Sequence, residues 1–133
     1  MDTTGIAPFL MFQDGRAEEA MRSYVGLFPR SEVLELQRHG PGGPGAEGSV
    51  ALARFVLDGL LVLCSDSAVQ HAFSFTPSVS LFVTCDAEAE VDRIAGALAE
   101  GGKTLMPLGD YGFSRRFAWV DDRFGVSWQV SRP

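Results

Sequence analysis

The sequence has little of what identifies several specialised classes of protein. Its 133 residues include only two cysteines and two histidines, and eleven basic residues against seventeen acidic ones give a net charge of −6. Two widely separated cysteines exclude a disulfide framework and a zinc site of the usual kind. The shortage of clustered Lys and Arg argues against a nucleic-acid partner and against binding to anionic lipid.

Long hydrophobic runs are lacking as well. The most apolar segment, residues 50–64, is interrupted by Arg54 and Asp58, and no run approaches the roughly 20 residues that span a bilayer. Residues 1–5 carry no basic region followed by an apolar stretch, so we expect no secretory signal. Cys64 and Cys85 both lie in apolar runs, where free thiols are commonly buried. We therefore predict a cytoplasmic protein with no membrane partner.

The residues that are present indicate one ordinary globular domain. The hydrophobic fraction is 46% and the charged fraction 21%, which is typical of a chain with a single packed core. Amphipathic helices are expected from Ala17 to Phe28 and around Val91 to Ala99, with Asp14 and Asp86 as N-caps. Strands are expected at 6–12, 31–38, 49–57, 60–66, 78–84, 103–108, 113–120 and 126–131.

This order is strand, helix and three strands, and it occurs twice. The second copy follows the first by about 72 residues, an offset that places Asp14 on Asp86. The pattern predicts the α+β class, with two βαβββ modules of about residues 1–70 and 71–133 in a single domain. The pattern disfavours a doubly wound nucleotide-binding fold, because helices do not alternate regularly with strands.

Several segments resemble the PhnB-like branch of the vicinal-oxygen-chelate superfamily, a branch also labelled 3-demethylubiquinone-9 3-methyltransferase-like. The segments are 8–12 (PFLMF), 17–21 (AEEAM), 27–29 (LFP), 48–50 (GSV) and 122–129 (DRFGVSWQ). The superfamily includes glyoxalase I, bleomycin-resistance proteins and extradiol dioxygenases. The resemblance implies mixed sheets that curve into cups, and two chains that pair into a homodimer.

The resemblance also allows the metal question to be asked position by position. Metal-dependent members hold the ion with His, Gln or Glu side chains, which suit a divalent cation. The four ligand positions fall here on Ala7 or Pro8, on one of Leu63, Cys64 and Ser65, on Ser78 and on Gln129. We therefore expect no metal site of the superfamily type and no other cofactor.

Methyl transfer is disfavoured by the position of the glycine-rich loop. A nucleotide-like methyl donor usually lies at a glycine-rich turn between a strand and a helix. The glycine-rich segment here, Gly40 to Gly48, lies between two predicted strands and contains two prolines.

Seven side chains are candidates for contact with a ligand, each with an ordinary structural alternative. Alternation along a strand places Gln129 on one face and Trp128 on the other, and Ser78 and Ser80 on a common face. Cys64 is a candidate nucleophile or a core residue, and Asp66 a candidate general base or a turn residue. Arg116 is a candidate anchor for an anionic group of a ligand. Tyr111 belongs to a segment that could cover a cup.

The sequence therefore predicts a protein that binds a small organic ligand in an apolar cup, without a superfamily-type metal. The alternative is an enzyme, either a lyase, isomerase or dioxygenase with a divergent metal site, or a metal-free acid–base catalyst that uses Asp66, Asp110 or Tyr111. A third hypothesis is a protein-interaction module that uses the long glycine-rich loop. An apolar cavity with convergent polar groups would favour the first two over the third.

Overall fold

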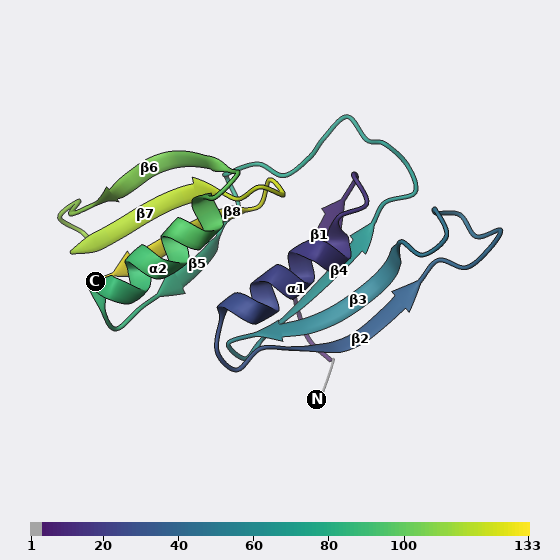
Figure 1. Cartoon of the computed structure of the whole chain (residues 1–133), viewed down its shortest axis with the longest axis horizontal. Coiled ribbons are helices and arrows are strands. Elements are labelled where there is room, and N and C mark those ends of the chain that lie inside the picture. Colours follow the sequence, from purple (N-terminus) through teal and green to yellow (C-terminus); the bar gives the residue numbers. More distant parts are fainter. Residues whose placement is uncertain (1–3) are drawn as a thin grey trace. The chain divides into compact units, whose positions relative to one another are not determined.

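Two units with the order β-α-β-β-β make up the chain, the first ending at Ser74 and the second beginning at Phe75 (Figure 1). The computed structural model describes residues 4–133. The elements of the first unit are β1 (Phe9–Phe12), α1 (Ala17–Leu27), β2 (Glu32–Arg38), β3 (Val50–Leu57) and β4 (Leu60–Asp66). Those of the second are β5 (Leu81–Thr84), α2 (Glu88–Ala99), β6 (Lys103–Gly109), β7 (Arg116–Asp121) and β8 (Ser127–Arg132). The predicted α+β class with two βαβββ modules is confirmed.

Each unit contains one curved, four-stranded mixed sheet. The strand order is β1-β4-β3-β2 in the first sheet and β5-β8-β7-β6 in the second. The first strand of each unit runs parallel to the last, and the remaining pairs are antiparallel. The predicted hairpin at Asp58-Gly59 joins β3 to β4, and both residues have positive φ angles, of 48° and 85°. This conformation matches the tight turn that favours glycine at its second position.

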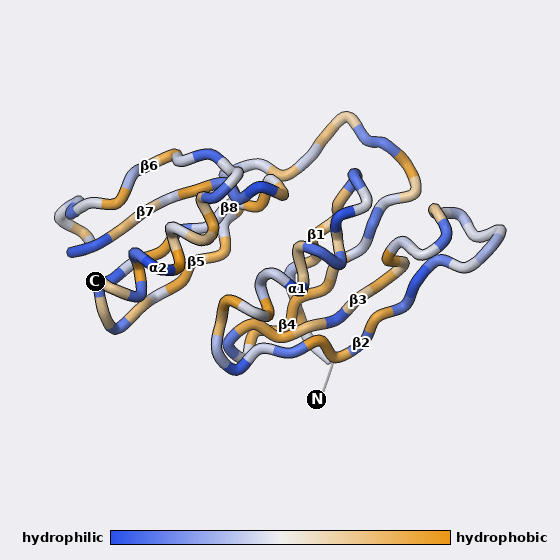
Figure 2. The backbone as a smooth tube through the Cα atoms, in the orientation of Figure 1, coloured by the Kyte–Doolittle hydropathy of each residue, from blue (hydrophilic) through white to orange (hydrophobic). Residues whose placement is uncertain are grey.

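Each helix covers one face of its own sheet, and the core lies between them (Figure 1). The hydrophobic residues gather in the strands and on one side of each helix, whereas the connection between β2 and β3 is mostly pale, and the one between β4 and β5 alternates between polar and hydrophobic residues (Figure 2). In the first unit Met21 and Tyr24 of α1 are buried over Phe55 and Val62 of the sheet. Because side chains alternate along a strand, the intervening residues form a second sheet face that no helix of the same unit covers.

The predicted helix caps are wrong. Arg16 precedes α1 and Ala87 precedes α2, and neither helix has a side-chain cap of its own at that position. In the first unit the backbone N–H of Ala17 instead donates to Oδ1 of Asp66, at 2.9 Å. A carboxylate 49 residues away in the sequence therefore takes the place that Asp14 was expected to fill.

Three strands begin three residues later than predicted, and the first of them, β1, begins at Phe9 rather than at Ile6. β5 begins at Leu81 rather than at Ser78, and the hydroxyl of Ser78 lies 2.7 Å from that of Thr76. β7 begins at Arg116 rather than at Phe113, after Ser114 has donated to the Arg116 carbonyl. Neither helix in the described part of the chain has the length and apolar character needed to cross a bilayer.

Candidate ligand-binding site

The face of the second sheet that points away from α2 carries an aromatic row. Phe82 is paired in register with Gln129, Gln129 with Trp119, and Trp119 with Met106. Paired residues project on the same side of a sheet. The neighbour of Trp119 on the strand, Val120, lines the space beneath α2, so the row lies on the opposite face. Phe82 is 58% exposed, and the other members of the row, Gln129, Trp119 and Met106, are partly exposed.

Hydrogen bonds fix the ring of Trp119 at this face. Its Nε1–H donates to the hydroxyl of Ser127 at 2.8 Å, and the Ser127 hydroxyl lies 2.8 Å from that of Ser80. The indole is thus held by a polar group from the neighbouring strand, and Trp119 as a whole is partly exposed. Such an arrangement gives a preformed aromatic wall with polar groups at its edge, as small-molecule sites commonly have.

Asp121 lies on the same face, one pair further along β7. It is opposite Ser127 in register, and Oδ1 of its carboxylate is buried without a hydrogen-bond partner. Within residues 4–133, it is the one buried side-chain nitrogen or oxygen atom that has no hydrogen-bond partner. Sequence reasoning missed Asp121, although it shares strand parity with Phe117 and Trp119, and this parity is the signal that could have identified it.

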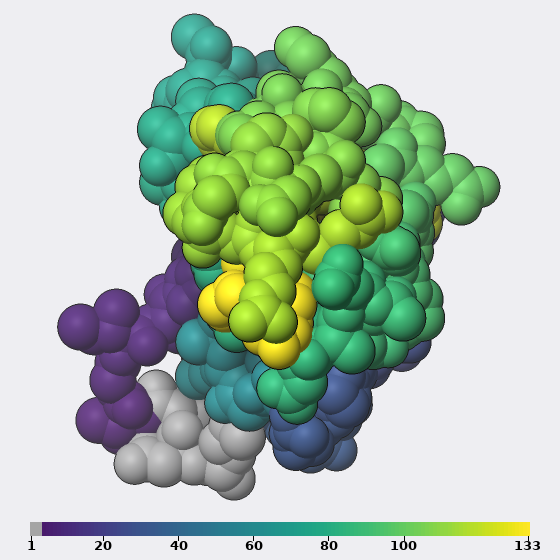
Figure 3. Space-filling model, turned by 90° about the vertical axis from the view of Figure 1, so that its left-hand side faces the viewer, coloured from purple at the N-terminus to yellow at the C-terminus, as the bar shows by residue number. Residues whose placement is uncertain are grey.

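The connection between β6 and β7 covers the other end of this face. Phe117 is 2% exposed beneath the rings of Tyr111 and Phe113, whose centroids lie 5.8 and 5.0 Å from its own. The Tyr111 hydroxyl donates to the Pro107 carbonyl at 2.6 Å, and Ser114 lies in the same connection, 2.9 Å from the Ser131 hydroxyl. Figure 3 looks toward this end of the unit, with the yellow-green connection and strand at the front.

The closing motif of the chain is a structural turn. Asp122 Oδ1 accepts from the backbone N–H groups of Phe124 and Val126, at 2.9 and 3.0 Å, and its Oδ2 accepts from Trp128 Nε1 at 2.9 Å. Gly125 has a φ of +94°, which favours glycine. Trp128 is buried on the α2 side, so Gln129 projects on the open face, as alternation predicts.

Cys64 and Asp66 lie on the α1 side of the first sheet. Cys64 is fully buried, and burial, together with the charge of Asp66, raises the pKa of its thiol to about 12. The thiol therefore stays protonated at neutral pH, which disfavours a nucleophile. Both oxygens of Asp66 are engaged, Oδ1 by Ala17 N–H and Oδ2 by Val50 N–H at 2.9 Å.

Arg116 and Ser78 also lie away from the aromatic row. Arg116 donates to Asp92 of α2 at 2.7 Å, on the helix side of the second sheet, and this contact raises the pKa of the guanidinium. Ser78 is in the loop before β5. Of the seven predicted contact residues, the structure brings Ser80, Tyr111 and Gln129 to one sheet face and leaves the other four elsewhere.

The side chains at the superfamily's metal-ligand positions do not fit a divalent ion. Gln129 offers one amide oxygen on the open face, Ser78 a hydroxyl, and Cys64 a protonated thiol that faces α1. Within residues 4–133, no three His, Cys, Asp or Glu side chains are grouped so as to hold a metal.

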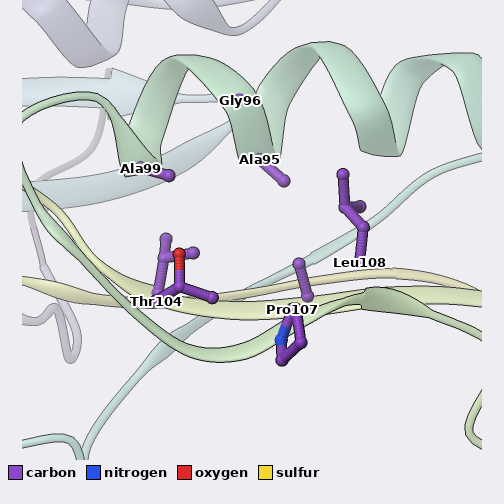
Figure 4. A pocket seen from close by; sticks show the side chains of 8 residues that line it. Ala95, Gly96, Ala99, Thr104, Pro107 and Leu108 are labelled. Carbon is purple, nitrogen blue, oxygen red and sulfur yellow. The ribbon is translucent and has the colours of Figure 1, made fainter.

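A cavity of about 140 Å³ lies beneath α2, on the opposite side of the sheet from Trp119. Figure 4 shows Ala95 and Ala99 of α2 facing Thr104 and Leu108 of β6 across it. The lining is aliphatic apart from the Thr104 hydroxyl. The cavity exists because small residues occupy this side of α2.

The open face of the first sheet has a different character. Phe9 and Leu63 are paired on it, and Arg54 forms an ion pair there with Glu35 of β2. Gln37 donates to the same carboxylate. The polar groups of this face thus bind one another.

Comparison with known proteins places the chain in a family. A sequence profile of the family described as 3-demethylubiquinone-9 3-methyltransferase matches residues 4–131. The structure of a PhnB protein from Bacillus cereus, a candidate 3-demethylubiquinone-9 3-methyltransferase by its description, is 48% identical over 98% of this chain and 100% of that one, with a TM-score of 0.94.

More distant structures share the fold. Protein PA1353 from Pseudomonas aeruginosa is 29% identical over 98% of both chains, with a TM-score of 0.83. A glyoxylase/bleomycin resistance protein/dioxygenase domain from Frankia sp. EAN1pec has a TM-score of 0.64 at 14% identity over 98% of both chains, which shows likeness of fold alone. No curated protein sequence gives a significant match.

Proposed function

The chain belongs to the 3-demethylubiquinone-9 3-methyltransferase family, in its PhnB-like branch, and from this membership and its site we propose that it binds a small organic ligand. The ligand would lie on the open face of the second sheet, against Phe82, Gln129 and Trp119. The single observation that carries this proposal is the exposed aromatic row, in which the Trp119 ring is fixed beside polar groups.

Methyl transfer, the activity in the family's description, has little support from the local geometry. The glycine-rich segment from Gly40 to Gly48 joins the antiparallel strands β2 and β3. A glycine-rich site for a nucleotide-like donor usually joins a strand to a helix, where backbone N–H groups and the helix N-terminus face the ligand.

No observation on the described residues favours the enzymatic alternative. Of the three groups considered for acid–base chemistry, Asp66 accepts two backbone N–H groups and Asp110 accepts the Gly112 N–H at 2.9 Å. The Tyr111 hydroxyl donates to a backbone carbonyl. All three are thus engaged in contacts that hold the fold.

We also propose that the protein forms a homodimer and is located in the cytoplasm. Large apolar side chains remain exposed in both units, including Phe9 at 51% and Phe113 at 66%, and exposed apolar surface of this kind commonly marks an interface. The two thiols are free and buried, which suits a reducing compartment. Sedimentation equilibrium would give twice the monomer mass of 14.3 kDa if the dimer exists.

The ligand proposal is tested by titrating indole and benzyl alcohol into the ¹⁵N-labelled protein. The two tryptophan N–H resonances make the test local, because Trp119 lies on the open face and Trp128 in the core. Binding at the proposed site would move the Trp119 resonance, identified with Trp119→Phe, and leave that of Trp128 in place. If neither probe moves the Trp119 resonance, or if both resonances move equally, the proposal is wrong.

A further inference from the structure

The centre of the aromatic row is a side-chain amide that the described residues leave unused. Gln129 lies on β8, between β5 and β7, and is paired in register with Phe82 and with Trp119 (Figure 1). Within residues 4–133 no hydrogen bond engages its amide. Both polar atoms of this amide reach solvent, because the one buried side-chain nitrogen or oxygen without a partner there belongs to Asp121. The Gln129 amide is therefore accessible to a ligand.

The fold does not require an amide at this position. The first sheet has a row across the same four strand positions, which consists of Phe9, Leu63, Arg54 and Glu35. Leu63 follows the hairpin glycine of its unit by four residues, as Gln129 follows Gly125 in the second unit. Because leucine serves at the corresponding place, the amide of Gln129 adds a polar group that the topology does not need.

The charges beside the row offset one another. Asp121 and Lys103 are opposite each other in register, next to the pair formed by Trp119 and Met106. Side chains of opposite sign in such a position attract each other. The row itself is uncharged, so the surroundings of Gln129 favour a neutral ligand. The net charge of −6 adds a repulsion of anions.

An amide presents a donor and an acceptor side by side, and a ligand edge with the complementary pair can form two hydrogen bonds with it. We propose that the open face of the second sheet binds a neutral, planar ligand with an N–H group beside a carbonyl oxygen, as in a lactam or a cis amide. Gln129 would form both hydrogen bonds, and Trp119 and Phe82 would contact the apolar body. This assignment rests on the proposed function and names its ligand class.

The test compares carbostyril, a lactam fused to a benzene ring, with N-methylcarbostyril, which keeps the carbonyl and has no N–H group. Each is titrated into the ¹⁵N-labelled protein while the Gln129 side-chain NH₂ and the Trp119 N–H resonances are followed. We expect carbostyril to bind about fivefold more tightly, since a hydrogen bond between neutral groups contributes about that factor. Two charged probes of similar size, naphthoate and naphthylmethylammonium, should bind more weakly than carbostyril.

Two matched variants locate the contact. Gln129→Leu removes both groups of the amide and identifies its resonance, and Leu63 indicates that the sheet accepts leucine there. In this variant carbostyril and N-methylcarbostyril should bind equally, whereas a preference caused by the bulk of the methyl group would survive. Gln37→Leu, on β2 of the first sheet, is the control and should keep the preference, because the Gln37 amide binds Glu35. Gln129→Met serves the same purpose if the leucine variant fails to fold.

The outcomes distinguish this inference from the proposed function. If N-methylcarbostyril binds as tightly as carbostyril, or if the preference survives in Gln129→Leu, the face binds ligands but the amide contact is wrong. If either charged probe binds more tightly than carbostyril, the assignment to a neutral ligand is wrong. If none of the probes moves the Trp119 resonance, the proposed function itself fails.

Discussion

The two units share a topology but use their buried carboxylates differently. In the first, Asp66 joins the start of α1 to the start of β3 through the N–H groups of Ala17 and Val50. In the second, Asp122 holds the turn between β7 and β8 and the ring of Trp128, and α2 begins without a side-chain cap. The repeated backbone pattern therefore does not depend on repeated polar residues.

The open faces of the two sheets differ in the same way. Arg54 and Glu35 bind each other on the first, whereas Asp121 on the second leaves a buried oxygen without a donor. Polar groups that bind one another are satisfied internally, whereas a buried acceptor without a donor is unfavourable. The polar groups are therefore satisfied differently on the two open faces.

Packing beneath the helices differs too. Met21 and Tyr24 of α1 are buried large side chains, whereas Ala95 and Ala99 of α2 leave a cavity of about 140 Å³ over β6 and β7. The second unit is thus the one with unfilled space on one side of its sheet and an unpaired acceptor on the other.

Removing the Asp122 carboxylate gives the largest expected effect. Asp122→Ala leaves two backbone N–H groups and the Trp128 indole N–H without their acceptor, and unsatisfied buried donors cost about 1–3 kcal/mol each. We expect the free energy of unfolding to fall by about 3 kcal/mol or more, measured by urea denaturation. The Trp128 N–H resonance should also move.

The exposed Asp86→Ala is the matched control and should change the free energy of unfolding by less than about 0.5 kcal/mol. Equal effects of the two substitutions would show that the Asp122 contacts are unimportant and would remove the main difference between the units' interiors.

Replacing a helical glycine by alanine should have a smaller effect, and it should raise the free energy of unfolding rather than lower it. A Cβ added at Gly96 of α2 would meet no atom within 4 Å, and the same holds for Gly26 of α1. Gly96 lies well inside α2, so Gly96→Ala should raise the free energy of unfolding by about 0.5–1 kcal/mol. Gly26→Ala should gain less, because Gly26 is next to the last residue of α1. A loss of stability in Gly96→Ala would contradict the open space seen there.

Much of the fold was predictable, because it depends on local patterns. The spacing of Ala17, Ala20 and Tyr24 gives α1, and Asp58-Gly59 fixes a hairpin by its backbone preference alone. The helix caps were not predictable in this way. Asp66 reaches the start of α1 only because β4 lies beside β1 and β3, which is tertiary information.

The same contrast between local and tertiary information applies to the candidate site. Strand alternation correctly separates Gln129 from Trp128, because a period of two needs only the register of one strand. It does not say which face the helix covers, so Cys64 and Arg116 could not be assigned to the helix sides of their sheets. Asp121 was missed because the lack of a donor to its carboxylate depends on tertiary contacts, among them the hydrogen bonds that engage the Ser127 hydroxyl.

The smallest predicted effect concerns the ion pairs that join each helix to its sheet. Glu18 of α1 binds Arg38 of β2 and Arg22, and these contacts lower the pKa of its carboxyl from 4.5 to about 2. Because folding lowers this pKa, the stabilisation is complete above about pH 4.5 and is lost as the pH falls through 2. Glu18→Gln should therefore reduce the free energy of unfolding at pH 7 by about 0.3–0.5 kcal/mol. The difference from wild type should largely disappear as the pH falls from 4.5 toward 2. Urea denaturation at pH 7, 4 and 2.5 measures it, with Glu47→Gln, at an exposed loop position, as the control. A difference that stays constant down to pH 2.5 would mean that Glu18 acts through packing rather than through its charge.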